Sequence, residues 1–279
     1  MSPLLRRALR RASEALALRP FVAQAPSPDG LKRCTFCDWE GPEFEGGWHC
    51  EEALCPGCGA NGRDRWLFHC LVTCVPGIGR RTRLMETSPR MGTAYKDAMS
   101  ARLDYLASDY DLRAHKADVA IDLQDIALPD DHLDVVLSAH VLEHVPDTDA
   151  ALRELFRVIK PGGSLVLLVP VLQPFTAPPA EPEFHGDDTP VFWRFGYDLT
   201  ERLDKHGFEA RLLCTEGFRL HVQDRNAFFG EGVSAEYDVA GLVAEAPGDL
   251  TVVCDDALTR TLGLLPYYMY LAWHARKPG

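Results

Sequence analysis

Short apolar runs alternate with helix-like segments over residues 80–215, and this alternation limits the possible folds more than any other feature of the sequence. Parallel strands joined by crossover helices produce such an order, because the chain must return to the same edge of the sheet before each new strand. We therefore expect an α/β fold with a doubly wound, mostly parallel, Rossmann-like sheet. The predicted strands are residues 82–85, 103–107, 133–137, 164–169 and 209–214.

The clearest helix of this pattern occupies residues 147–160, between two predicted strands. Apolar side chains recur there at intervals of three and four residues, which places them on one helical face. Asp147 or Thr148 can cap its first turn, and the proline and glycines that begin at Pro161 can stop it. An amphipathic helix at this point is the crossover that a doubly wound sheet requires.

A cysteine cluster precedes the alternating region. Cys34 and Cys37 form one CxxC pair, Cys55 and Cys58 form a second, and 17 residues separate the two pairs. This spacing lies within the window of about 15 to 20 residues that is typical of a four-cysteine zinc site. Four thiolates complete the tetrahedral coordination of zinc, so we expect a closed, structural Zn²⁺ site in a small N-terminal element.

Two nearby residues leave an alternative ligand set open. His49 and Cys50 lie between the pairs, and either can replace one cysteine. The remaining cysteines occur in apolar stretches, as small core residues do. A disulfide framework is not expected, because thiols stay reduced in a chain without a secretory signal.

Residues 1–30 predict an amphipathic helix, since leucines and alanines recur at helical spacing with arginines mostly opposite them. Such a helix can pack on the protein's own body, or lie on a membrane surface or a partner. No apolar run approaches the roughly 20 residues of a membrane span, so we expect a cytoplasmic protein without one. The formal net charge of −12 argues against nucleic acid as a partner, because phosphate binding needs a basic surface.

The run at residues 122–170 carries a family resemblance. It combines an acidic strand end, an LPDD turn, an apolar strand, VLEHV, an amphipathic helix and KPGG before a buried strand. In this order these features resemble the second half of a class I S-adenosylmethionine (SAM)-dependent methyltransferase core of the type 11 kind. The segment CPGCGANGRDRWL at residues 55–67 is similar to a CPxCGSxxRxR segment in a subset of bacterial methyltransferases. That likeness implies that Arg63 and Arg65 face the zinc thiolates or the core.

The resemblance implies a SAM site at the ends of the strands. Asp109 stands where the family places the carboxylate that binds the ribose hydroxyls. Asp122 and Leu123 stand at the adenine-binding step, where the acid accepts from the exocyclic amine and the leucine covers the ring. The residues expected to bind the cofactor are Glu86, Thr87, Ser88, Gly92, Asp109, Asp122, Leu123, Ser138 and His140.

The glycine-rich loop of the family is altered in this sequence. The family pattern is E/DxGxGxG, where glycines let the backbone approach the cofactor. Residues 86–92 read ETSPRMG, which keeps the acid at Glu86 and only the last glycine, Gly92. Ser88 stands at the first glycine position of the pattern. A glycine there only leaves space for the cofactor, whereas the serine hydroxyl can donate a hydrogen bond.

Three histidines are considered for the group that removes a proton from the methyl acceptor, and two of them, His140 and His185, are preferred. His140 follows the fourth strand, at the position that borders the methyl group in the family, and histidine accepts protons near neutral pH. His144 lies one helical turn further and is the weaker candidate. The second candidate base, His185, belongs to residues 171–197, which are too long and too rich in proline and aromatic residues for a simple connection. This segment predicts a substrate lid.

These features predict three units: an N-terminal helix at 1–30, a zinc element at 31–66, and a SAM-binding domain at 67–279 that carries the lid. No motif is recognised at residues 226–263, and the oligomeric state is not indicated. The leading expectation is methyl transfer to oxygen or nitrogen of a small molecule, such as a sugar or a secondary-metabolite intermediate. Two alternatives are a SAM-consuming intramolecular cyclase that releases methylthioadenosine, and a non-catalytic scaffold.

Overall fold

The computed structural model describes residues 21, 23–37, 39–46, 52–90, 92–115, 117–185, 188–223, 237–264 and 271–279. Residues 1–20 of the predicted N-terminal helix lie outside this part of the chain. His49 and Cys50, the alternative zinc ligands, lie outside it as well.

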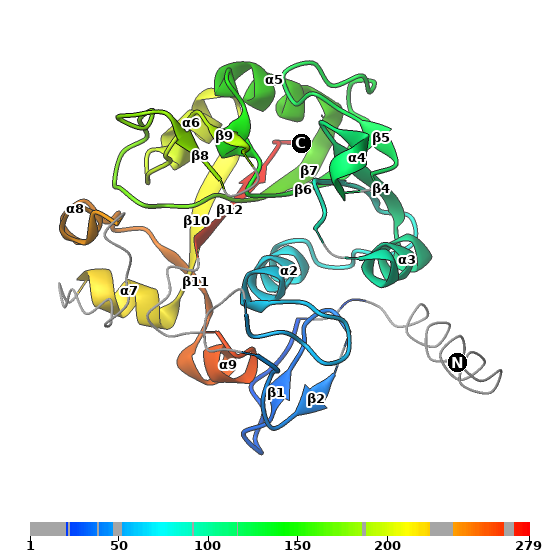
Figure 1. Cartoon of the computed structure of the whole chain (residues 1–279), viewed down its shortest axis with the longest axis vertical. Coiled ribbons are helices and arrows are strands. Elements are labelled where there is room, and N and C mark those ends of the chain that lie inside the picture. Colours follow the sequence, from blue (N-terminus) through cyan, green and yellow to red (C-terminus); the bar gives the residue numbers. More distant parts are fainter. Residues whose placement is uncertain are drawn as a thin grey trace.

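A central sheet of eight strands organises the described residues (Figure 1), in the order β11-β10-β12-β7-β6-β3-β4-β5. Neighbours from β5 to β7 are parallel, whereas β12 runs antiparallel between β7 and β10. The mostly parallel, doubly wound prediction is therefore confirmed. The strands are β3 (Arg83–Thr87), β4 (Asp104–Asp109), β5 (Val119–Ala120), β6 (Leu133–Ala139), β7 (Ile159–Leu168), β10 (Glu209–Thr215), β11 (Thr251–Cys254) and β12 (Leu271–Arg276).

Helices cover both faces of this sheet (Figure 1). None of the described helices is long and apolar enough to cross a membrane. The helices are α2 (Gly62–Cys74), α3 (Thr93–Arg102), α4 (Leu112–His115), the 3₁₀ helix η1 (Leu142–His144), α5 (Thr148–Val158), α6 (Leu199–Lys205), α7 (Glu216–Gln223), α8 (Val239–Ala244) and α9 (Asp256–Thr261).

Successive side chains of the central strands enter two separate hydrophobic cores. Leu84 packs with α2 on one face, and its neighbour Met85 packs with α5 and α6 on the other. Val135 and Val136 repeat this alternation on β6. Because strand side chains alternate and both faces are covered, these strands read as continuous apolar runs.

The five predicted strands coincide with β3, β4, β6, β7 and β10 to within a few residues, except at the start of β7. That strand begins at Ile159, because α5 already ends at Val158 and the proline–glycine run continues as strand. The pairing with β6 is irregular there, and Gly162 has φ +79°, a conformation that glycine adopts without strain. Of the two predicted caps, Asp147 is the one that accepts from the first turn, at the Ala150 amide.

The cysteine-rich segment is a small hairpin, β1 (Lys32–Arg33) with β2 (Glu40–Gly41), that packs against the sheet domain. Lys32 donates to the carbonyl of Arg260 in α9, which lies beside β1 in Figure 1. The predicted boundary between residues 66 and 67 falls inside α2. The division of the chain into three units stays a prediction.

Residues 237–263, within a region where no motif was recognised, contribute α8, β11 and α9. Strand β11 extends the sheet beyond β10. Helix α9 and the turn after it meet the cysteine-rich segment. The segment therefore joins the far edge of the sheet to the N-terminal element.

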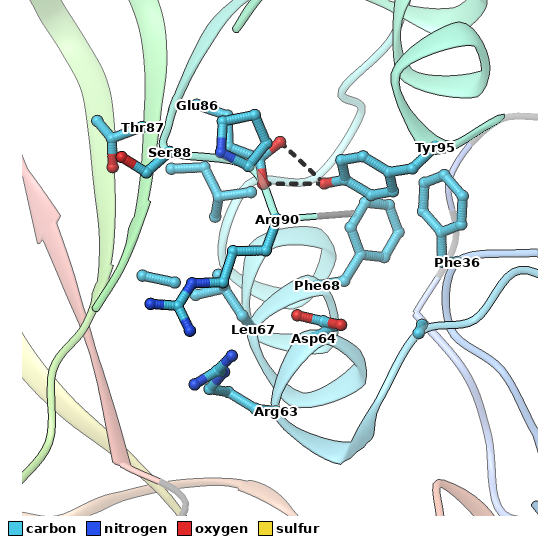
Figure 2. Close-up of a pocket in the computed structure, with 14 residues that line it drawn as sticks. Phe36, Arg63, Asp64, Leu67, Phe68, Glu86, Thr87, Ser88, Arg90 and Tyr95 are labelled. Carbon is cyan, nitrogen blue, oxygen red and sulfur yellow. Dashed lines mark hydrogen bonds between the residues drawn. The ribbon is translucent and has the colours of Figure 1, made fainter. Parts of the chain in front are cut away.

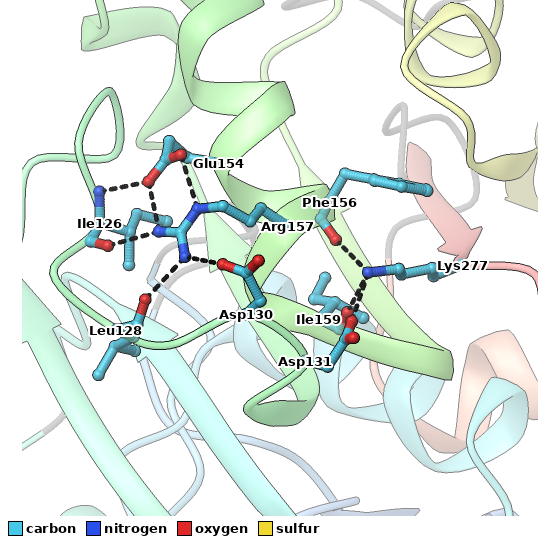
Figure 3. A network of polar contacts seen from close by, with 9 residues as sticks. All are labelled: Ile126, Leu128, Asp130, Asp131, Glu154, Phe156, Arg157, Ile159 and Lys277. Atoms are coloured by element: carbon cyan, nitrogen blue, oxygen red, sulfur yellow. Dashed lines mark hydrogen bonds and ion pairs between the residues drawn. The ribbon is translucent and has the colours of Figure 1, made fainter.

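A polar network holds the loop that follows Asp122 (Figure 3). Arg157 in α5 donates to the carbonyls of Ile126 and Leu128 at 2.7 and 2.8 Å. Its partner Glu154 accepts from the Ile126 amide at 2.9 Å. These bonds tie the loop to α5, so the segment that begins at Asp122 is fixed beside the ends of the strands.

Candidate functional site

The carboxyl ends of β3, β4 and β6 meet at one edge of the sheet, where ligands bind in doubly wound folds. The Thr87 hydroxyl donates to the Ser138 hydroxyl at 2.9 Å and so links the ends of β3 and β6. The Ser88 amide donates to the carbonyl of Ser108 on β4 at 2.7 Å. The structure thus brings Thr87, Ser88 and Ser138 together.

Two residues at this edge have left-handed backbone conformations. Ser88 has φ +46° after β3, and His140 has φ +53° after β6. A side chain at such a φ costs roughly 1–2 kcal/mol. Non-glycine residues of this kind cluster at functional sites. Ser88 thus adopts the backbone shape that glycine favours, at a position where the family pattern has glycine.

Glu86, on β3, is buried below this edge. The hydroxyls of Tyr95 and Tyr105 donate to its carboxyl oxygens, the shortest bond being 2.7 Å from Tyr105. Burial raises the pKa of Glu86 to about 7, and the two tyrosine hydroxyls act in the opposite direction. Glu86 is therefore a buried acid with partners and not a solvated strand end.

A pocket opens between these strand ends and the first turn of α2 (Figure 2). Residues 86–90 and the end of β6 line one side, and Phe36, Phe68 and Tyr95 line another. Phe36 lies between the first two cysteines and packs against Tyr95, with ring centroids 4.6 Å apart. The cysteine-rich segment thus contributes directly to the wall of the pocket.

The pocket carries charges of both signs. Arg63 from α2 and Arg90 from the loop after β3 extend toward the same side (Figure 2), whereas Asp64 and Glu86 supply acids. Arg63 therefore lines the pocket. Arg65 faces the core, as one of the expected alternatives required, and donates to backbone carbonyls.

The other predicted cofactor residues lie near this edge without lining the pocket. Asp109 accepts from the Asp111 amide and from Nδ1 of His115 at 2.7 Å. Asp122 accepts from the Gln124 amide at 2.9 Å. Leu123 is buried in the core, and Gly92 precedes the first turn of α3. A Cβ added at Gly92 would meet nothing within 4 Å, so close backbone packing does not require this glycine.

Three histidines gather beside the pocket. His140 is mostly buried, and burial, reinforced by the charges of Arg63 and Arg90, holds its pKa well below the usual value. His144 packs edge-on against His185, with ring centroids 4.7 Å apart. The two candidate bases thus reach one region from different segments, and His144 lies against the second of them.

The predicted lid lies over η1. Its short hairpin consists of β8 (Glu183–Phe184) and β9 (Pro190–Val191). The amides of Phe192 and Trp193 donate to the carbonyl of Glu143, and the Trp193 indole donates to that of Pro146 at 3.0 Å. These contacts hold the lid on η1, and His185, in the loop between β8 and β9, packs against His144 of η1.

The four predicted zinc ligands converge. Their sulfurs all lie within 4.8 Å of one another, with Cys34 to Cys58 at 3.6 Å and Cys37 to Cys55 at 3.5 Å. A tetrahedral zinc with Zn–S bonds of about 2.3 Å sets its sulfurs about 3.8 Å apart, so the arrangement fits the ion. Within the described part of the chain, no other group of three or more such ligand atoms is this close.

Sequence reasoning missed Glu143 and the orientation of Arg63 and Arg90. Glu143 is 2% exposed and precedes His144 in the VLEHV run. Its burial depends on the lid folding over η1, which no local pattern reveals. The altered loop held a signal for Arg90 that was not used, because a long cation stands there at a glycine position of the family pattern.

Part of the chain is similar to known proteins. Residues 55–167 match a family model described as a methyltransferase domain. A probable S-adenosylmethionine-dependent methyltransferase of Mycolicibacterium smegmatis is 32% identical over 142 residues, which are 50% of this chain and 52% of that protein. A ubiquinone/menaquinone biosynthesis C-methyltransferase of Vibrio parahaemolyticus is 43% identical over 61 residues, 21% of this chain and 24% of the relative.

Among solved structures, an S-adenosylmethionine-dependent methyltransferase of Mesorhizobium loti is 16% identical to this chain. The likeness covers 76% of this chain and 98% of that one, with a TM-score of 0.45. The chain spans about half the length, or less, of the curated relatives described above.

Proposed function

We propose that this chain, which carries a class I methyltransferase domain, binds SAM and transfers its methyl group to an oxygen or nitrogen of a small molecule. One observation carries the proposal: the pocket at the ends of β3 and β6 lies largely within the stretch that matches the methyltransferase domain. Doubly wound folds bind their ligands at this edge. The substrate class rests on further features of the same site.

The charged end of the pocket suits the amino-acid part of SAM, which carries a carboxylate and an ammonium group. Arg63 and Arg90 can hold the carboxylate through charge-assisted hydrogen bonds. Asp64 and Glu86 supply acids for the ammonium. These four side chains would then supply some of the cofactor contacts that the backbone of the glycine-rich loop supplies in the family.

Asp109 has the capacity to bind the ribose. A carboxylate offers about four acceptor positions, and the Asp111 amide and His115 use two of them. Two positions are left for two hydroxyl donors. Asp122 and Leu123, on the loop that Arg157 fixes, are proposed for the adenine ring.

When bound, SAM supplies a methyl group that is already activated, so the chain must mainly orient the acceptor and remove its proton. His140 is proposed as the base, because a pKa held below its usual value leaves the imidazole neutral and able to accept a proton. His185, from the lid, is the second proposed base. The aromatic lid and the net charge of −12 favour a small acceptor over nucleic acid.

The four cysteines are proposed to hold a structural zinc. Four thiolates fill its coordination, so no position is open for substrate. Phe36 stands between two of the ligands and lines the pocket, so the metal would shape the cofactor site through packing.

Calorimetry with two ligands tests the cofactor proposal. S-adenosylhomocysteine carries the carboxylate, whereas 5′-methylthioadenosine lacks the whole aminobutyrate group. We expect both to bind, and we expect Arg63→Gln to weaken only the first, about tenfold or more, because a charge-assisted hydrogen bond contributes about 1.5–3 kcal/mol. Arg113→Gln is the control, since its side chain is 91% exposed. Absence of binding by SAM and by both analogues contradicts the proposed function.

A further inference from the structure

Glu143 is a buried acid whose carboxyl group makes no hydrogen bond to any residue that the structure describes. Both of its carboxyl oxygens are shielded from solvent, and neither has a hydrogen-bond partner within the part of the chain that the structure describes. Most buried polar side chains do have one, because an unpaired polar group in the interior costs free energy. An exception beside a candidate active site points to a functional reason.

Two imidazoles flank this carboxyl group. Nδ1 of His140 lies 3.5 Å from Oε1 of Glu143, and Nε2 of His144 lies 3.9 Å from the same oxygen. The first distance exceeds the usual hydrogen-bond length by only about 0.5 Å. A small movement of either side chain therefore makes a Glu143–His140 hydrogen bond.

His144 is not free to change its proton position. Its Nδ1 lies 2.7 Å from the carbonyl oxygen of Pro190, and a carbonyl only accepts, so Nδ1 carries the proton. In the neutral ring Nε2 is then unprotonated and cannot donate to Glu143. His140 is the one of these two rings whose tautomer Glu143 can set.

A metal ion does not explain the cluster. Among the described residues, only the four cysteines bring three or more ligand atoms within 4.8 Å of one another. The imidazoles of His140 and His144 approach Glu143 without forming such a group. Proton chemistry is the explanation that the geometry favours.

We propose that Glu143 is the positioning residue of His140: its carboxylate accepts the proton on Nδ1 and leaves Nε2 as the nitrogen that takes the acceptor's proton. This inference rests on the proposed methyl transfer, with His140 as the base. The acceptor's proton passes to Nε2, and its electron pair bonds to the methyl carbon as the bond from that carbon to sulfur breaks. The imidazolium that forms donates from Nδ1 to Glu143 and later releases its proton to solvent.

The charges around Glu143 determine when this state forms. Arg63 on α2 and Arg90 after β3 lower the pKa of Glu143, but burial outweighs them and raises it to about 8. His144 on η1 is the other titratable group at the carboxyl, and His185 lies behind it. As pH rises through about 8, Glu143 loses its proton and becomes able to accept from Nδ1.

The test follows the His140 tautomer by NMR in protein that carries ¹⁵N-labelled histidine. Loss of its signals in His140→Gln identifies the residue among the ten histidines. In the wild type we expect Nδ1 to gain its proton, and Nε2 to lose its own, with a midpoint near pH 8. In Glu143→Gln this transition should vanish, because glutamine does not titrate. Glu209→Gln, whose side chain is 64% exposed, should keep it.

An unchanged transition in Glu143→Gln overturns the proposal. If that variant does not fold, ¹³C-labelled glutamate in the wild type decides: a carboxyl titrating near pH 8 that disappears in Glu143→Asp supports the proposal, and the absence of any such carboxyl refutes it. Neither measurement needs a methyl acceptor or SAM. A chain that fails to bind SAM but shows the tautomer shift therefore refutes the proposed function and leaves the Glu143–His140 interaction standing.

Discussion

Replacing Arg65 with methionine should destabilise the whole chain. The Arg65 side chain is fully buried, and its guanidinium donates to the carbonyls of Leu262, Ala53 and Ala60 at 2.7–2.8 Å. It also stacks 3.7 Å from the ring centroid of Phe44. One side chain thus joins α2, both ends of the loop around the second cysteine pair, and the turn after α9.

The size of this loss of stability follows from the three backbone carbonyls that lose their hydrogen-bond donor when Arg65 is replaced. A buried group that loses its partner costs about 1–3 kcal/mol, and three groups relax together, so the costs do not simply add. We expect Arg65→Met to lower the free energy of unfolding by about 3–5 kcal/mol, within the range for breaking buried charged contacts. Arg65→Lys keeps the charge but loses the fork geometry, so it should recover only part of the loss.

Urea unfolding followed by far-ultraviolet circular dichroism measures this effect. Arg113→Met is the control, because its 91% exposed side chain should change stability by no more than about 0.5 kcal/mol. Since Arg65 links the cysteine-rich segment to the sheet domain, a single transition is also expected. A loss below about 1 kcal/mol, or a separate early transition of the N-terminal element, would show that Arg65 does not hold the two parts together.

Two further predictions concern the metal and the buried acid. Purified protein should contain about one zinc per chain by atomic absorption. The variants Cys34→Ser and Cys58→Ser should lose the zinc and unfold at a lower urea concentration. The control Cys74→Ser, which lies outside the cluster, should retain the zinc. Full stability without metal contradicts the zinc assignment. Burial raises the pKa of Glu86 from 4.5 to about 7, so the stability that its protonated form contributes is present below about pH 4.5 and is lost as pH rises through about 7. Between about pH 4.5 and about pH 7, the free energy of unfolding of Glu86→Gln should therefore rise relative to that of the wild type by up to about 3 kcal/mol, since one pKa unit corresponds to about 1.4 kcal/mol. A stability difference that does not change with pH would contradict this prediction.

The sheet was predictable because each buried parallel strand appears in the sequence as a short run of apolar residues. Apart from Asp134, residues 133–137 are apolar on both faces, and this signal does not depend on distant contacts. Strand β11 and helix α9 gave no such signal. Strand β11 has four residues at the sheet edge, and α9 has six, so neither is long enough to show a clear period.

The candidate site was predictable only in part. The spacing of the CxxC pairs predicts that the four sulfurs converge, because each pair turns its two ligands toward one point. The partners of Asp109 and Glu86 come from other segments, and their distances depend on packing. Glu143 shows the limit most clearly, since its burial requires residues 190–193 to fold over η1. Whether a glutamate is solvated or enclosed cannot be decided from its sequence neighbours.

Transfer of the methyl group can be followed directly with labelled cofactor. Protein is incubated with methyl-labelled SAM and a cell extract separated into small-molecule, RNA and protein fractions, with His140→Ala as the matched variant. We expect label to enter the small-molecule fraction with the wild type and to be strongly reduced there with His140→Ala. Label in RNA or protein, or methylthioadenosine formed without any acceptor, would contradict methyl transfer to a small molecule.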